Sequence, residues 1–201
     1  MKCYPVIILF LLLAACHAKK DTVNPPPQSV APVADAADTA GNFFPVTEYL
    51  KGQIAEIKTN GITPVDRVTI KGHTDSSWLN SDAKMQQAFA DFLSPVIDTA
   101  NLKKVFSEKK FKDETLNAFT FTYDPANAGA DSFPFRHWDV YVSPDNNKVK
   151  RIYLVKQAPG GRMLQMTWQS GKWCKIVTLK TTGDNTEIEK EENISLAYNK
   201  E

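Results

Sequence analysis

Residues 163–180, MLQMTWQSGKWCKIVTLK, decide the fold class of this chain. Apolar and polar side chains alternate on both sides of Ser170-Gly171, which is the pattern of half-buried β-strands. Two residues are the length of a tight hairpin loop, so we expect two antiparallel strands in a register that places Trp168 opposite Trp173. Cys174 then lies on the other face of this hairpin.

The same alternation begins near Asn117 and continues toward the C-terminus. Turn sequences such as SPDNN at 143–147 and PGG at 159–161 separate the predicted strands by short connections, which join antiparallel neighbours. Upstream, apolar residues recur at helical spacing over 46–57 and 81–96. The sequence therefore predicts an α+β domain in which N-terminal helices pack on an antiparallel β-meander of five to seven strands.

Three segments upstream of Asn117 have weaker patterns. DRVTIK at 66–71 is expected to be a short strand, and GHTDSSW at 72–78 a turn shaped by Asp75. The lysine-rich stretch 103–112 is expected to be a solvated helix face, with contact to anionic lipid headgroups as the alternative.

The first fifteen residues have the composition of a secretory signal peptide. Lys2 is their only charged residue, and the apolar run Val6–Leu13 is followed by small residues. This run is shorter than the roughly 20 residues that cross a bilayer. The sequence Leu13-Ala14-Ala15-Cys16 resembles the lipobox of bacterial lipoproteins, which implies cleavage before Cys16 and acylation of its sulfur and amine. The alternative is a soluble secreted protein with an unmodified Cys16.

Cleavage after residue 15 would leave 186 residues with 23 basic and 23 acidic side chains, and therefore no net charge. A neutral chain is not a binder of nucleic acid through bulk charge, so no nucleic-acid partner is expected. Cys3 would leave with the signal peptide and Cys16 would be acylated, which leaves Cys174 without a disulfide partner. We expect Cys174 to be a small buried apolar residue.

The processed chain divides into two parts. Residues 16–42 comprise Cys16 and a stretch rich in Pro and Ala, which has too few apolar side chains to fold and is expected to be a disordered tether. Residues 43–201 are expected to form a single globular domain.

No residue pattern in the chain is specific for catalysis or for a metal. HExxH, HxH, CxxC, GxSxG, P-loop and GxGxxG motifs do not occur, so we expect no metal and no cofactor. One predicted strand face combines a His, a carboxylate, a guanidinium and two phenols, which could bind a polar ligand or a partner. These candidate residues are His137, Asp139, Tyr141, Arg151 and Tyr153. The competing interpretation is a solvated sheet face with one ion pair.

As a whole the chain resembles uncharacterised lipoproteins of the Bacteroidota envelope. This resemblance implies an anchor in the cell envelope through acylated Cys16, and His17, which is not Asp, favours the outer membrane facing the periplasm. We expect a non-catalytic binding or interaction module, with an unknown protein partner or an apolar ligand. The alternatives are a carrier of an apolar or amphipathic ligand between helices and sheet, and an enzyme that uses His137, Asp139 and Arg151.

Overall fold

The computed structural model describes residues 43–97 and 99–196. The predicted signal peptide, Cys16 and the predicted tether lie outside these residues.

The domain is α+β, with one mostly antiparallel sheet of nine strands. The helices are α1 (Val46–Thr59), α2 (Asp82–Leu93), α3 (Thr99–Leu102) and a 3-10 helix, η1 (Ala128–Ser132). The strands are β1 (Val65–Ile70), β2 (His73–Trp78), β3 (Phe106–Asp113), β4 (Ala118–Pro125), β5 (Phe135–Val142), β6 (Val149–Ala158), β7 (Arg162–Gln169), β8 (Trp173–Thr182) and β9 (Asn185–Ser195).

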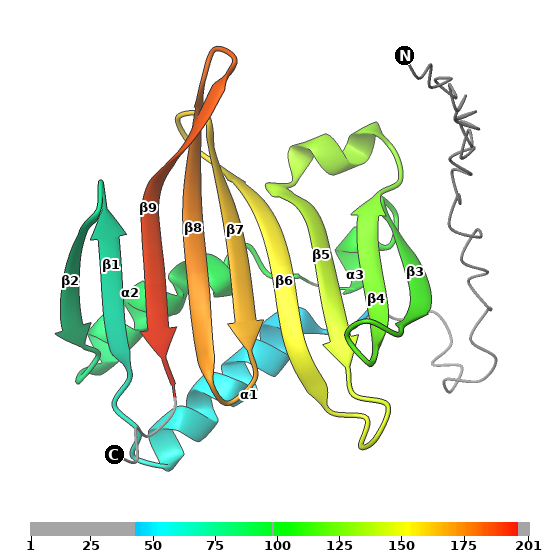
Figure 1. Ribbon diagram of the computed structural model, residues 1–201. Helices are drawn as coiled ribbons and strands as arrows, with labels where there is room; N and C mark the ends of the chain where they lie inside the picture. The colour runs from blue at the N-terminus through cyan, green and yellow to red at the C-terminus, as the bar shows by residue number, and fades with distance from the viewer. Residues whose placement is uncertain (1–42, 98, 197–201) are drawn as a thin grey trace, which may run out of the picture.

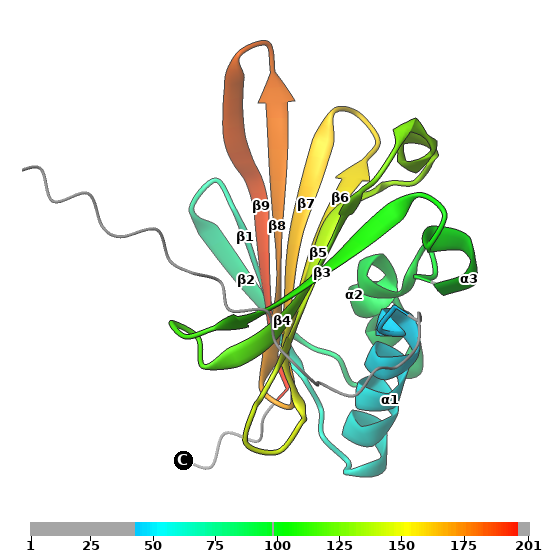
Figure 2. The same ribbon diagram turned by 90° about the vertical axis from the view of Figure 1, so that its right-hand side faces the viewer.

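The strand order is β2-β1-β9-β8-β7-β6-β5-β4-β3, so β2 and β3 are the two edges (Figure 1). The connection from β2 to β3 contains α2 and α3 and crosses the sheet from one edge to the other. Figure 2 shows that α1, α2 and α3 all lie on the same side of the sheet. The strands from β3 to β9 then follow one another as the predicted meander.

Both long helices follow from the sequence pattern. In α1, Val46, Leu50 and Ile57 recur at helical spacing and are buried. α2 begins after Ser81, whose hydroxyl accepts a hydrogen bond from the backbone N–H of Lys84, as the side chain of an N-cap residue does. Each helix therefore presents one apolar stripe to the sheet.

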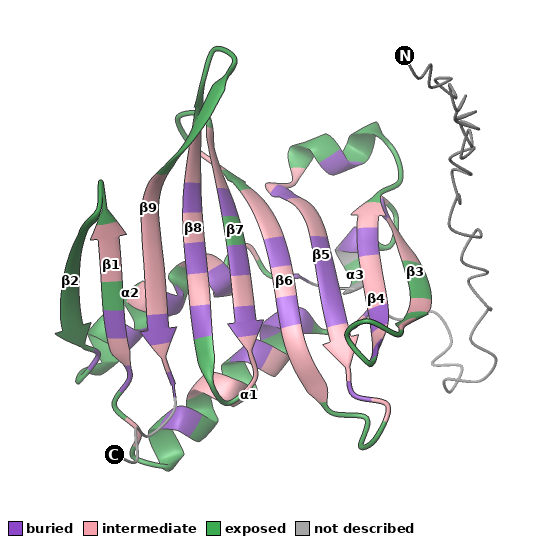
Figure 3. Ribbon diagram, in the orientation of Figure 1, coloured by how far each residue is buried: buried purple, intermediate pink, exposed green. Residues whose placement is uncertain are grey.

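The core lies between the helices and the central strands (Figure 3). The rings of Phe89 and Phe92 on α2 both contact Trp168 edge-on, with centroids 5.4 Å apart. On β4 and β5, Tyr123 stacks on Trp138 at 4.8 Å. Such aromatic contacts contribute about 0.5–1.5 kcal/mol each beyond the burial of their area.

The predicted number of five to seven strands is wrong because two segments were assigned to other structures. GHTDSSW contains β2, which pairs with β1 through a two-residue turn in which Lys71 and Gly72 both have positive φ. The turn prediction missed this strand because all its side chains are exposed and, apart from Trp78, they are polar. Most of the lysine-rich stretch lies in β3, whose pairing with β4 overrides the helical appearance of its sequence.

The predicted register of β7 and β8 is wrong by one residue. The loop has three residues, with the N–H of Lys172 bonded to the carbonyl of Gln169 and Gly171 at φ 66°. Trp168 therefore lies opposite Cys174, and both are buried in the core. Trp173 points to the other face and is 40% exposed.

A three-residue turn with a bulge at Pro144-Asp145-Asn146 would place Asp139 opposite Arg151, and this predicted register of β5 and β6 is wrong by two residues. Asp139 lies opposite Tyr153, and not opposite Arg151 as the sequence suggested. A shift of two residues leaves every side chain on its predicted face, because side chains alternate with a period of two. β6 contains a β-bulge at Lys150, the extra residue between the pairs Tyr141–Arg151 and Val142–Val149.

The sheet face opposite α1 and α2 is called the open face here, because no helix of the described chain lies on it (Figure 2). It receives the strand residues that alternate with the core, such as Tyr153 on β6 and Lys175 on β8. These side chains are partly exposed, so a partner could contact them.

Replacing Trp168 and Trp173 separately tests this register. Trp168→Ala removes a fully buried ring and should lower the free energy of unfolding by about 3–5 kcal/mol. The matched change Trp173→Ala lies on the open face and should cost about 0.5 kcal/mol. Urea denaturation followed by circular dichroism measures both. Equal costs would contradict the observed register.

Candidate functional site

The structure brings the five residues of the predicted face together on the open face of β5 and β6. His137, Asp139 and Tyr141 alternate along β5. Tyr141 lies opposite Arg151 and Asp139 lies opposite Tyr153, whose ring centroid is 6.2 Å from that of His137. Arg151 lies over the ring of Tyr141, 4.2 Å from its centroid.

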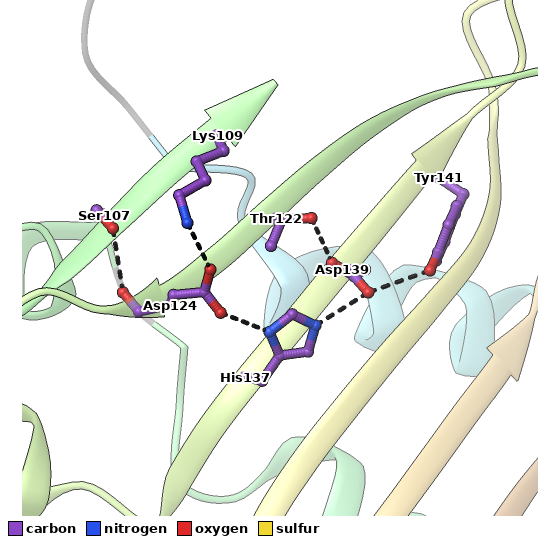
Figure 4. A network of polar contacts seen from close by, with 7 residues as sticks. All are labelled: Ser107, Lys109, Thr122, Asp124, His137, Asp139 and Tyr141. Atoms are coloured by element: carbon purple, nitrogen blue, oxygen red, sulfur yellow. Dashed lines mark hydrogen bonds and ion pairs between the residues drawn. The ribbon is translucent and has the colours of Figure 1, made fainter. Parts of the chain in front are cut away.

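His137 is held between two carboxylates (Figure 4). Its Nδ1 lies 2.8 Å from Oδ1 of Asp124 on β4, and its Nε2 lies 3.0 Å from Oδ2 of Asp139. A carboxylate only accepts hydrogen bonds, so both contacts are satisfied together when both ring nitrogens carry a proton. The geometry therefore favours the imidazolium form of His137.

Asp139 is the centre of this network and is 8% exposed. The hydroxyl of Thr122 donates to its Oδ1 at 2.6 Å, and the hydroxyl of Tyr141 donates to its Oδ2 at 3.1 Å. Together with His137 these donors satisfy a nearly buried charge, which would otherwise cost several kcal/mol.

The network shifts several pKa values. Burial disfavours a charged His137, but hydrogen bonds and charge from Asp124 and Asp139 outweigh burial and raise the pKa of His137 above 6.5. Burial opposes ionisation of Asp124, but His137 and Lys109 outweigh it and lower the pKa of Asp124 below 3.8. Burial, with the neighbouring Asp139 carboxylate, raises the pKa of Tyr141 to about 12.

Sequence reasoning missed three members of the network. Asp124 and Thr122 reach it from β4, and Lys109 reaches Asp124 from β3 at 3.2 Å. The alternation of β4 could have shown that Thr122 and Asp124 share a face. Their pairing with Asp139 and His137 could not be predicted from the sequence, because the connection from β4 to β5 contains η1 and does not fix the register of the two strands.

A second feature of the open face is a row of residues that are neighbours across seven strands. The row comprises Tyr141, Arg151, Gln169, Trp173, Ser195, Val65 and Trp78, from β5 to β2. We call it the aromatic row. Trp173 is 40% exposed and Trp78 is 60% exposed. Exposed Trp, Tyr and Arg side chains are the types enriched in protein interfaces.

His73, Asp75 and Cys174 carry groups with possible chemistry but do not form a site. His73 and Asp75 lie on β2 with side chains 3.3 Å apart and largely exposed, and not in a turn. Burial strongly raises the pKa of the Cys174 thiol, so this residue lacks thiolate character. No group of three or more His, Cys, Asp and Glu residues that could hold a metal ion occurs in residues 43–97 and 99–196.

Two of the clefts in the described part of the chain lie beside the sheet. The larger, of about 740 Å³, lies on the helix side, where Asp91 of α2 faces Leu164 and Ile188 of the sheet. The smaller, of about 90 Å³, lies on the open face and is lined by Leu116, Ala118, Tyr141, Lys150, Arg151 and Gln169. Trp138 and Trp168 line neither cleft, because aromatic rings fill the space around them.

None of the helices in the described part of the chain has the length and apolar character needed to cross a membrane. Comparison with known proteins gives no match: no family model matches the chain, and no curated protein or solved structure is significantly similar to it.

Because His137 lies between the carboxylates of Asp124 and Asp139, we expect the stability of the folded domain to depend on pH. A proton held more tightly in the folded state stabilises it fully below the ordinary pKa of about 6.5, and this contribution disappears as the pH rises through the raised pKa. His137→Gln should therefore cost about 1–3 kcal/mol of unfolding free energy near pH 6, and less near pH 9. Urea denaturation at both pH values measures the difference.

His73→Gln is the matched control, because the His73 side chain is 80% exposed. It should change the free energy of unfolding by less than about 0.5 kcal/mol at either pH. A cost for His137→Gln that is constant across this range would contradict the imidazolium assignment.

Proposed function

We propose that this protein is a lipid-anchored envelope protein whose domain is a non-catalytic interaction module. It binds a protein partner through the open face of its sheet. The aromatic row carries this proposal, because it places two exposed Trp side chains, a Tyr and an Arg in one line across the sheet.

The geometry of the polar network also supports a binding role. A general base needs a free lone pair, and both nitrogens of His137 face carboxylates at 2.8 and 3.0 Å. The hydroxyl of Tyr141 instead donates a hydrogen bond to Asp139, which fixes the position of the Tyr141 ring. The guanidinium of Arg151 packs over this ring. Rigid side chains of these types lose little conformational entropy when a partner docks.

A carrier of an amphipathic ligand is the second candidate, and the larger cleft favours it. Its volume of about 740 Å³ falls within the range of small-molecule sites. Ile70 and Ile188 line it and are 48% and 60% exposed, while Lys180 and Arg162 supply charge at its walls. Displaceable binding of a fluorescent fatty acid in this cleft would place the carrier function first.

Photo-crosslinking in cells that make the full chain tests the interaction face. With benzoylphenylalanine in place of Ser195, which lies within the aromatic row, we expect one covalent adduct of defined mass. The same replacement of Gln87, which is exposed on α2, should give none. The adduct should disappear in the double variant Trp78→Ala, Trp173→Ala. Adducts of equal yield from positions 195 and 87 would overturn the proposal.

The anchor is tested by removing the proposed acylation site. Cys16→Ser should move the protein from the membrane fraction to the soluble fraction, because acyl chains supply the membrane affinity. Cys174→Ser removes a buried thiol and is the matched control, which should stay with the membrane. Retention of Cys16→Ser in the membrane fraction after a high-salt wash would show that the anchor is elsewhere.

A further inference from the structure

The β-bulge on β6 places two cationic side chains in one small pocket. Along a regular strand, Lys150 and Arg151 would point to opposite faces of the sheet. The extra residue at Lys150 breaks this alternation, and both side chains line the cleft of about 90 Å³ on the open face. Bulges often re-aim a side chain toward a site in this way.

Neither cation has an anionic partner in the described chain. Lys150 donates to the backbone carbonyls of Leu116 at 3.0 Å and Asn117 at 3.4 Å, which fixes its direction and leaves one of its three N–H groups. Arg151 lies against the Tyr141 ring. The ion pairs among residues 43–97 and 99–196 include neither residue.

The acid of the network that lies next to Tyr141 already has a cationic partner. Both oxygens of Asp139 accept hydrogen bonds from hydroxyl groups, and its Oδ2 pairs with Nε2 of His137 at 3.0 Å. Asp139 forms no ion pair with Lys150 or Arg151. The pocket keeps an excess of positive charge that one anionic group would balance.

The walls of the pocket favour a carboxylate attached to carbon over a phosphate. The cleft of about 90 Å³ is open to solvent and admits a small anionic group. The planar guanidinium of Arg151 matches a carboxylate, and Leu116 and Ala118 offer an apolar wall to the adjoining carbon.

We propose that the pocket between Lys150, Arg151 and Gln169 binds one carboxylate of a polypeptide partner. Tyr141, Arg151 and Gln169 belong to the aromatic row, so a partner lying along this row would present its carboxylate at the β5 end. This inference rests on the proposed interaction function and adds the chemical group that the partner must supply.

Nuclear magnetic resonance of the full chain in neutral detergent, labelled with ¹⁵N-arginine, tests this site. The chain has four arginines, Arg67, Arg136, Arg151 and Arg162, so each Nε–H signal can be followed. The probes are sodium acetate, the tripeptide acetyl-Ala-Ala-Ala with a free carboxylate, its C-terminal amide and sodium phosphate. We expect acetate and the free-acid peptide to shift the Arg151 signal saturably. The amide and sodium chloride of equal ionic strength should not shift it.

Two lysine variants that change the charge by the same amount show whether binding of the free-acid peptide depends on the pocket itself or only on the net charge nearby. Lys150→Gln removes a cation that lines the pocket and should weaken binding of the free-acid peptide about tenfold, the equivalent of one charge-assisted hydrogen bond. Lys148→Gln removes a neighbouring lysine that does not line the pocket and should leave the affinity unchanged.

Three results would overturn the carboxylate site. They are the absence of a saturable Arg151 shift, equal responses to the free-acid peptide and its amide, and equal binding of phosphate and acetate. The crosslink from position 195 does not depend on this titration. A lost crosslink refutes the interaction face, whereas a failed titration with an intact crosslink refutes only the carboxylate pocket.

Discussion

The crossing connection between β2 and β3 is the constraint on which the rest of the structure depends. These strands are the two edges of a nine-stranded sheet, so the chain between them must cross one face. α2 makes part of this crossing and buries Phe89 and Phe92 against Trp168. α1 lies on the same side, so the apolar side chains of the strands gather there (Figure 2). The polar and aromatic residues that alternate with them then share the open face.

Alternation explains how much of the site could be predicted from sequence. Along one strand a period of two fixes which residues share a face, and the β5–β6 register was wrong by an even number of residues. His137, Asp139 and Arg151 therefore lie on one face of the sheet, as expected, although Asp139 faces Tyr153 and not Arg151. At the β7–β8 turn the error was one residue, because Lys172 joins the loop, and Trp173 moved to the open face. A prediction of which sheet face a residue lies on stays correct when the register is shifted by an even number of residues. It is wrong when the shift is an odd number.

Other features depend on contacts that no local pattern contains. The aromatic row requires β1 to pair with β9, which places Val65 beside Ser195 although 130 residues separate them in the chain. The row also requires β2, a strand with few apolar residues that is held by its turn and by pairing with β1. A bulge such as that at Lys150 is equally hidden, because it arises from the way two turns and two strands fit together.

The polar network and the pocket form one electrostatic system across β3 to β6. From Lys109 the charges alternate in sign through Asp124, His137 and Asp139, so each interior group has an opposite neighbour when His137 is protonated. Beyond Asp139 the last charged residue is Arg151, and the bulge brings Lys150 into the same pocket. No acid of the described chain forms an ion pair with Lys150 or Arg151. Internal pairing therefore accounts for the network but leaves its β6 end positive. That end lies on the surface, where an anion from another molecule can reach it.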